Sequence, residues 1–173
     1  MGWFRKLLNA ETLENLDDLV IQQIEDLYSA ERQLVNALPN MIEAAHSQDL
    51  KQAFTDHLAE TRMHVQRLEQ VFREFGHEPR AVTCEAMQGL IAEADELISM
   101  IGDAETKDAA LIAAAQRVEH YEIAGYGCVR SFASRLGRPR AVALLQETLD
   151  EEASADRRLT QIAEESVNAK AIH

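Results

Sequence analysis

Four long stretches of this chain repeat their apolar residues with the 3.6-residue period of an α-helix, and this pattern limits the fold more than any other feature. Gly and Pro number only 7 and 3 in 173 residues. No segment alternates apolar and polar residues as a half-buried strand does. The sequence therefore predicts an all-α protein, and residues 1–173 are expected to form a single domain.

Residues that start or end helices divide the chain into expected segments. Ser47 and Thr83 are expected N-caps, and Gly76 and Gly137 are expected to end helices. Pro39 is expected to kink or break the first helix. The expected ranges are a lead-in at 1–12, helices at 13–46 and 47–75, a short helix at 84–101, and helices at 107–136 and 140–167.

The connections between the four long helices are unequal in length. The first and second helices are joined by a short turn, as are the third and fourth, so each pair is expected to form an antiparallel hairpin. The connection between the pairs is long and carries the short helix. A four-helix bundle with one long crossover has the connectivity of ferritin-like folds.

Carboxylates stand in the middle of the apolar face in three of the long helices. Glu31 is central on the first helix, and Glu119 and Glu122 lie on the apolar side of the third. Glu152 is central on the fourth helix, with Asp156 one turn further along the same face. The sequence therefore predicts that acidic groups from several helices meet in the interior.

The second long helix carries its polar candidates on the flank of the apolar face. Glu60 and His64 are one turn apart there, with His57 near them. The helical wheel leaves open whether this flank turns inward and whether His57 is a ligand. Glu151, the neighbour of the central Glu152, is expected to point to solvent.

Several ionised carboxylates in one interior need compensation, because burying them alone costs several kcal/mol each. Protonation is one form of compensation, since mutual repulsion raises pKa values. No Lys or Arg stands at the centre of any apolar face, so a bound cation is the other candidate. Carboxylates combined with imidazole suit iron or manganese, whereas an all-oxygen cage would suit magnesium or calcium.

The formal net charge of −13 argues against binding to nucleic acid or to an anionic membrane surface. No apolar run approaches the roughly 20 residues of a membrane-spanning helix, and the N-terminus has no signal-peptide pattern. The two cysteines, Cys84 and Cys128, form neither a zinc motif nor a disulfide framework. A cytoplasmic location is therefore expected.

Four segments of the chain, in order, resemble the YciE/YciF family of bacterial ferritin-like proteins. They are "LYSAERQL", "HLAETRMHVQRLEQVF", "AALIAAAQRVEHYEIAGYG" and "LLQETLDEEASADRRLT". The resemblance extends over residues 12–167. It implies a ferritin-like bundle, a homodimer, a two-metal centre and a role in bacterial stress responses.

Comparison with the wider group of di-iron carboxylate proteins implies a ligand for each helix, with one Glu bridging two ions at a separation of roughly 3.5 to 4 Å. Two departures from that group stand out. Glu60 and His64 are four residues apart rather than three, and the fourth helix has Asp156 where the group has a histidine. The implied ligands are Glu31, Glu60, His64, Glu119, Glu122, Glu152 and Asp156.

Two functions from different classes follow from these features. The first is a di-metal oxidoreductase or iron-handling protein that oxidises Fe(II) with dioxygen or peroxide, or removes peroxide. The second is a structural or interaction protein that keeps the bundle but has lost, or never uses, the metal site, and the missing second histidine favours it. The metal and the substrate stay open at this level. Glycoside hydrolysis by a carboxylate pair is disfavoured, since an aromatic content of 5% offers few platforms for sugar.

Overall fold

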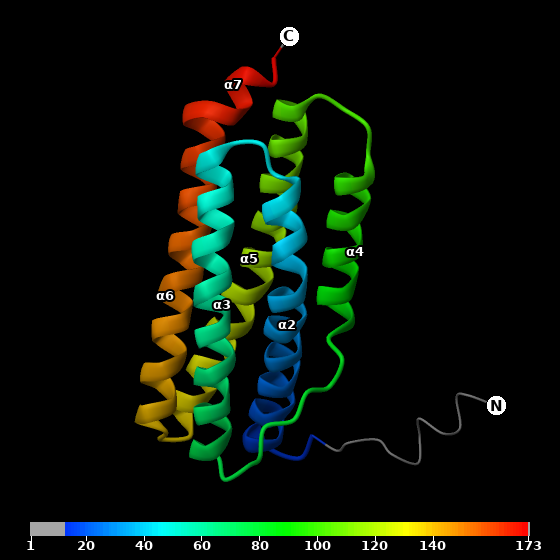
Figure 1. Cartoon of the computed structure of the whole chain (residues 1–173). Coiled ribbons are helices and arrows are strands. Elements are labelled where there is room, and N and C mark those ends of the chain that lie inside the picture. The colour runs from blue at the N-terminus through cyan, green and yellow to red at the C-terminus, as the bar shows by residue number, and fades with distance from the viewer. Residues whose placement is uncertain (1–12, 173) are drawn as a thin grey trace, which may run out of the picture.

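Helices α2 (Leu16–Ala44) and α3 (Gln48–Glu74) form one antiparallel pair in the computed structural model, which describes residues 13–172. Helices α5 (Ala104–Arg135) and α6 (Pro139–Ile162) form the second pair. The pairs pack side by side, with α3 against α6 and α2 against α5 (Figure 1). This is a four-helix bundle of ferritin-like connectivity, and the predicted all-α fold is confirmed.

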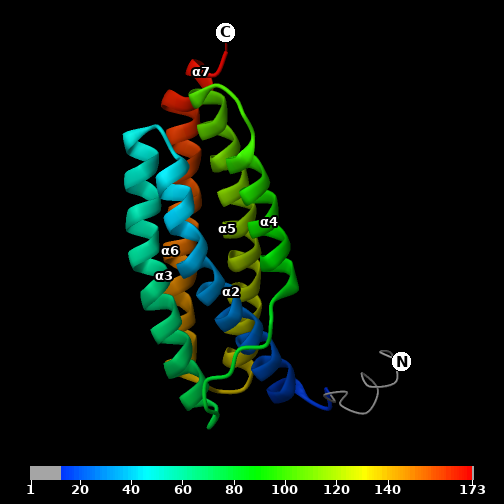
Figure 2. The same cartoon turned by 45° about the vertical axis from the view of Figure 1, so that its right-hand side comes forward.

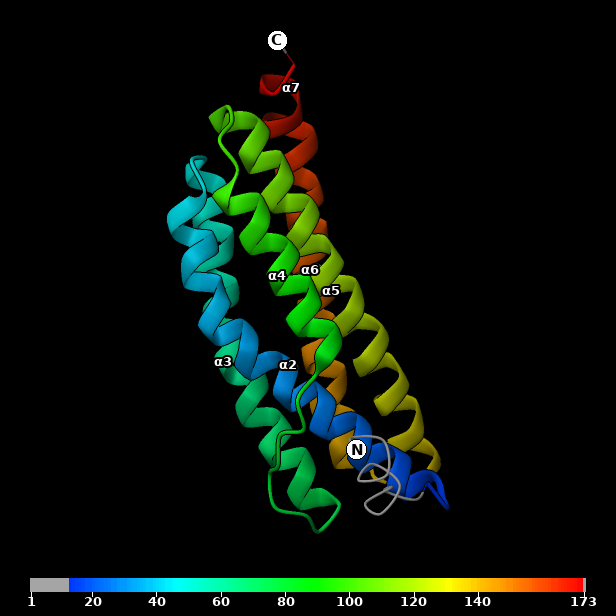
Figure 3. The ribbon, with the colours of Figure 1, turned by 90° about the vertical axis from the view of Figure 1, so that its right-hand side faces the viewer.

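The long crossover from α3 to α5 carries helix α4 (Glu85–Ser99), which lies outside the bundle against α2 and α5 (Figure 2). Figure 3 shows the same helix in front, between these two neighbours. Its N-cap is Cys84, whose thiol accepts a hydrogen bond from the Met87 N–H at 3.4 Å. The expectation that Thr83 caps this helix is wrong, because the Cys84 N–H is itself anchored to Ser29 Oγ on α2 at 3.0 Å.

Two long helices differ from the expected course. Helix α2 has no break at Pro39 and continues to Ala44, since Pro39 removes a single hydrogen bond and the apolar side chains of Leu38 and Met41 beside it are buried in the bundle. The last helix, expected to reach residue 167, ends as an α-helix at Ile162. It continues as a π-helical turn, η1 (Ala163–Val167), and then as α7 (Asn168–Lys170).

Capping residues explain where several of the long helices begin and end. Ser47 caps α3 by accepting a hydrogen bond from the Leu50 N–H at 3.4 Å. Gly76 and Gly137 have φ of +75° and +67°, a conformation that other residues rarely adopt. After each glycine, the next N–H bonds back to a carbonyl five residues earlier at 3.0 Å. These caps end the helices where the sequence predicts.

The buried apolar residues form two separate clusters, one toward the α2–α3 turn and the other toward the α5–α6 turn. On α3, α5 and α6 the gaps between the clusters run from Leu58 to Leu68, from Val118 to Tyr126 and from Leu145 to Leu159. Each gap contains buried polar residues. A polar layer therefore crosses the middle of the bundle.

Helix α5 approaches α2 closely beside this layer. A Cβ at Gly125 would lie 2.8 Å from Leu27 Cδ2, so the absence of a side chain permits the contact. One residue further along α5, the hydroxyl of Tyr126 donates a hydrogen bond to Glu31 on α2. The close approach of α5 to α2 therefore allows Tyr126 to hold Glu31 in the polar layer.

Two expectations concern the surroundings of the bundle. None of the helices within residues 13–172 is both long and apolar enough to cross a membrane. The lead-in expected at 1–12 lies outside the described residues.

Candidate metal centre

The polar layer brings together four carboxylates and two imidazoles from all four long helices. They are Glu31 of α2, His57 and His64 of α3, Glu119 and Glu122 of α5, and Glu152 of α6. All six residues are buried. Their donor atoms fall into two groups, within each of which the atoms lie within 4.8 Å of one another.

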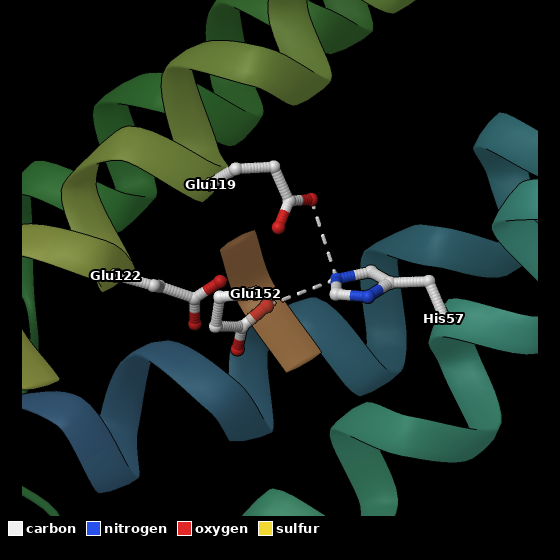
Figure 4. Close-up of side chains that lie close together, drawn as sticks. All are labelled: His57, Glu119, Glu122 and Glu152. Carbon is white, nitrogen blue, oxygen red and sulfur yellow. Dashed lines mark ion pairs between the residues drawn. The ribbon is translucent and has the colours of Figure 1, made fainter. Parts of the chain in front are cut away.

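The first group consists of His57, Glu119, Glu122 and Glu152 (Figure 4). The Nε2 atom of His57 lies 3.3 Å from Glu119 Oε1 and 3.9 Å from Glu152 Oε2. Glu122 points toward the same centre from α5 (Figure 4). Neither of its oxygens has a hydrogen-bond partner among the described residues.

The second group consists of Glu31, His64 and Glu152. The Nδ1 atom of His64 lies 3.0 Å from Glu152 Oε1 and 3.3 Å from Glu31 Oε1. Glu152 therefore belongs to both groups, with one oxygen toward each histidine. This arrangement suits a carboxylate that bridges two ions.

The chemistry of these donors fits two divalent cations. Within residues 13–172, most of the buried side-chain oxygen and nitrogen atoms without a hydrogen-bond partner belong to this layer, and they include both oxygens of Glu152. His64 Nδ1 is among them, although it lies close to two carboxylates, because those contacts lack hydrogen-bond geometry. Donors 2.0–2.2 Å from one ion lie roughly 3–3.6 Å from each other, as several of these do. Four carboxylates, two neutral imidazoles and two divalent ions also sum to zero charge.

Without metal, protons supply the compensation. Burial acts to lower the pKa of His57, but the surrounding carboxylates outweigh it and raise the pKa to about 9. Burial also acts to lower the pKa of His64, but the carboxylates of Glu152 and Glu31 outweigh it and raise this pKa to about 11. Burial raises the pKa of Glu122 well above its usual range, and neighbouring carboxylates raise it further. The metal-free layer is therefore rich in protons that a metal would displace.

The structure brings together five of the seven ligands that the sequence implies, and it leaves Glu60 and Asp156 outside both groups. The Glu60 side chain is 37% exposed and lies 3.7 Å from His57 Nδ1, on the other edge of the ring. Asp156 accepts a hydrogen bond from Gln116 at 3.1 Å and lies 3.3 Å from His120.

His57, whose role the sequence left open, takes the place of the histidine missing from α6. His57 and His64 are seven residues apart, which on a helix is two turns along one face. Thr61, buried between them, completes an inward-facing polar line. That spacing was the signal that could have identified His57. The layer has the four carboxylates and two histidines of di-iron carboxylate proteins, distributed differently over the helices.

Glu151 was expected to point to solvent, but its carboxylate contacts two side chains of α3. Its Oε2 lies 2.9 Å from His64 Nε2, and it forms an ion pair with Arg67, whose other nitrogen lies 2.7 Å from Glu147. The carboxylate thus contacts the edge of the imidazole opposite to the candidate centre. A carboxylate in this position orients a ligating imidazole and selects its tautomer.

An apolar cavity of about 40 Å³ reaches the first group from the side of α4. Leu38, Phe54 and Val118 contribute to its wall, and His57 and Glu119 lie at its polar end. A cavity of this size and character suits a small apolar molecule better than a hydrated ion.

Comparison with known proteins places these features in context. Residues 15–172 match a family described as "Domain of unknown function (DUF892)". Protein YciF of Escherichia coli is 45% identical over 160 residues, which span 92% of this chain and 96% of that protein. The crystal structure of YciF, described as a stress protein, matches with a TM-score of 0.87 at 44% identity, covering 90% of this chain and 99% of that one.

Two further solved structures are similar. YcfI of Rhodopseudomonas palustris, for which a structural role has been suggested, matches with a TM-score of 0.86 at 44% identity, over 89% of this chain and 98% of that one. A protein of Anabaena variabilis with DJ-1/ThiJ/PfpI-like and ferritin-like domains matches with a TM-score of 0.59 at 16% identity. That match covers 90% of this chain and 39% of the other, and it bears on the fold alone.

Proposed function

Because this chain belongs to the DUF892 family and has the stress protein YciF as a relative, we propose that it is a stress-related protein with a two-metal centre. His57, Glu119 and Glu122 would hold one ion, Glu31 and His64 would hold the other, and Glu152 would be shared between them. The observation that carries the proposal is the position of Glu152, whose two oxygens face different histidines and have no hydrogen-bond partner among the described residues.

Iron is the expected metal and manganese the second candidate, since carboxylates mixed with imidazoles suit both. When bound, iron would supply one-electron transfer to dioxygen or peroxide. The protein's own contribution is to hold the donors in place and to limit water. Tyr126 holds Glu31, Glu151 orients His64, and the apolar cavity offers a route for a small oxidant. A homodimer and a cytoplasmic location remain part of the proposal, as the family resemblance and the sequence imply.

Elemental analysis of the protein purified without added metal tests the proposal directly. Two equivalents of iron or manganese per chain are expected. Protein without bound metal that also takes up neither ion on titration would contradict the proposal. It would favour the alternative, a structural protein whose buried carboxylates are neutralised by protons. The suggestion of a structural role for YcfI and the raised pKa of Glu122 both support that alternative.

Replacing Glu151 by Gln is expected to weaken metal affinity about 10- to 100-fold, because the residue behind a ligating imidazole contributes on this order. Titration of the metal-free protein with Co(II), followed by its visible absorption, measures the change. Glu147→Gln is the matched control, since Glu147 pairs with Arg67 but does not contact His64 in the structure. Equal affinities in the two variants would show that Glu151 does not position the ligand.

The stabilisation by metal is expected to grow as pH rises. In the metal-free protein the pKa values of His57 and His64 lie above the ordinary 6.5, at about 9 and about 11. The stability that these protons contribute is therefore complete below pH 6.5 and is lost as pH rises through those values. Metal must displace the same protons, so the affinity of the protein for metal rises as pH rises.

Melting temperatures of chelated and Mn(II)-loaded protein between pH 5.5 and 8.5 test this expectation. The difference between the two samples should widen steadily toward pH 8.5. A difference that is constant over this range would mean that neither imidazole loses a proton on metal binding.

A further inference from the structure

A second cavity, of about 60 Å³, reaches the candidate centre between α3 and α6. Glu60, Ser154 and Arg158 give it a polar wall, and His57 and Glu119 lie at its inner end. At roughly 10–15 Å³ for each water position, it has room for about four to six waters. A partly hydrated cation therefore fits this cavity better than the apolar one beneath α4.

His57 lies between this cavity and the centre. Its Nε2 faces Glu119 at 3.3 Å, while its Nδ1 faces Glu60 at 3.7 Å. The ring is only 7% exposed, and Nδ1 has no hydrogen-bond partner among the described residues. Glu60, in contrast, is 37% exposed. Glu60 and His57 thus connect solvent with the buried layer. The Nδ1 atom of His57, which faces the cavity, is the nitrogen without a hydrogen-bond partner in the described part of the chain.

The charges around the cavity favour a cation. Arg158, the basic residue of the wall, forms an ion pair with Asp56 at 2.7 Å. The hydrogen bond from Arg158, followed by one from Gln52, lowers the pKa of Asp56, which is therefore a stable counter-charge. With Arg158 compensated, Glu60 and Glu119 are the remaining acidic residues that line the cavity, and Glu60 is the more exposed of the two.

We propose that Glu60 is a transit site at which a divalent cation binds before it passes His57 and enters the centre. The inference rests on the proposed two-metal function. It gives Glu60 a role different from the permanent ligand that the sequence implied. A transit carboxylate changes the rate of metal uptake, whereas a permanent ligand changes the number of ions bound or their affinity.

The test is the rate at which metal-free protein takes up Co(II), followed by stopped-flow absorption, together with the stoichiometry at equilibrium. Glu60→Gln is expected to slow uptake about tenfold while still binding two equivalents with affinity within about threefold of the wild type. The difference should shrink at high salt, because electrostatic attraction at an exposed site is screened. Glu60→Asp, which keeps the charge, should restore much of the rate.

Glu43→Gln is the matched control, since Glu43 is an exposed carboxylate on α2 that does not line the cavity. It should leave the uptake rate unchanged. If Glu60→Gln takes up two equivalents at the wild-type rate, the transit site is excluded and the two-metal centre stands. Loss of an equivalent in Glu60→Gln would instead make Glu60 a ligand. Wild-type protein that binds no cobalt would remove the centre and the transit site together.

Discussion

Glu152→Gln is expected to prevent the stable binding of either metal ion, a larger effect than that of any other single substitution in the layer. Glu152 is the residue that both donor groups share, and its oxygens face His57 and His64 separately. Removing one partner of a buried charge pair costs about 3–5 kcal/mol, or roughly a hundredfold or more in affinity. An amide also cannot bridge two cations as a carboxylate does. Both ions should therefore be affected.

Elemental analysis and Co(II) titration measure this effect. Glu119→Gln is the matched control, because it removes the same charge from the first donor group alone. That variant should retain the ion held by Glu31 and His64. If Glu152→Gln keeps two tightly bound ions, Glu152 does not bridge them and the assignment of the two groups is wrong.

Metal removal is expected to lower the melting temperature by about 8–16 °C for each ion lost. An ion present at 1,000 times its dissociation constant stabilises the folded protein by about 4 kcal/mol, and each kcal/mol shifts the melting temperature of a chain of this size by about 2–4 °C. The physical cause is the layer itself, where the carboxylates face one another without hydrogen-bond partners for most of their oxygens.

Differential scanning calorimetry of Mn(II)-loaded and chelated protein at pH 7.5 checks the shift. Glu152→Gln should melt at nearly the same temperature with and without metal, which separates binding at the centre from binding at the acidic surface. Wild-type protein that melts alike in both states, with no ion found by analysis, would favour the structural alternative.

Much of the bundle was predictable from the sequence because helical periodicity and caps are local properties. The short turns at Ser47 and Gly137 and the long crossover specify the connectivity. The similarity to YciF and to its crystal structure confirms the family resemblance that the four segments indicated. The N-cap of α4 was predicted incorrectly, because the hydrogen bond from the Cys84 N–H to Ser29 on α2 makes Cys84 the cap instead of Thr83.

Among the candidate site residues, those at the centre of an apolar face could be placed from the sequence. Glu31, Glu122 and Glu152 are buried because the apolar residues around them must face the core, whatever the details of packing. Glu119, beside Glu122, follows the same rule. Residues on the flank of a face have no such constraint.

The rotation of α3 and the depth of each residue along the bundle were decided by the tertiary structure. A helical wheel gives directions about its own axis, but only packing against α2 and α6 determines which flank turns inward. That packing directs His57 to the centre and leaves Glu60 at the surface cavity. One turn beyond Glu152, Asp156 is already out of the layer and contacts Gln116. The sequence by itself determined which helices form and which of their faces are buried. The contacts between helices decided which polar side chains meet, because donor atoms must converge within a few ångströms and no single helix sets that distance.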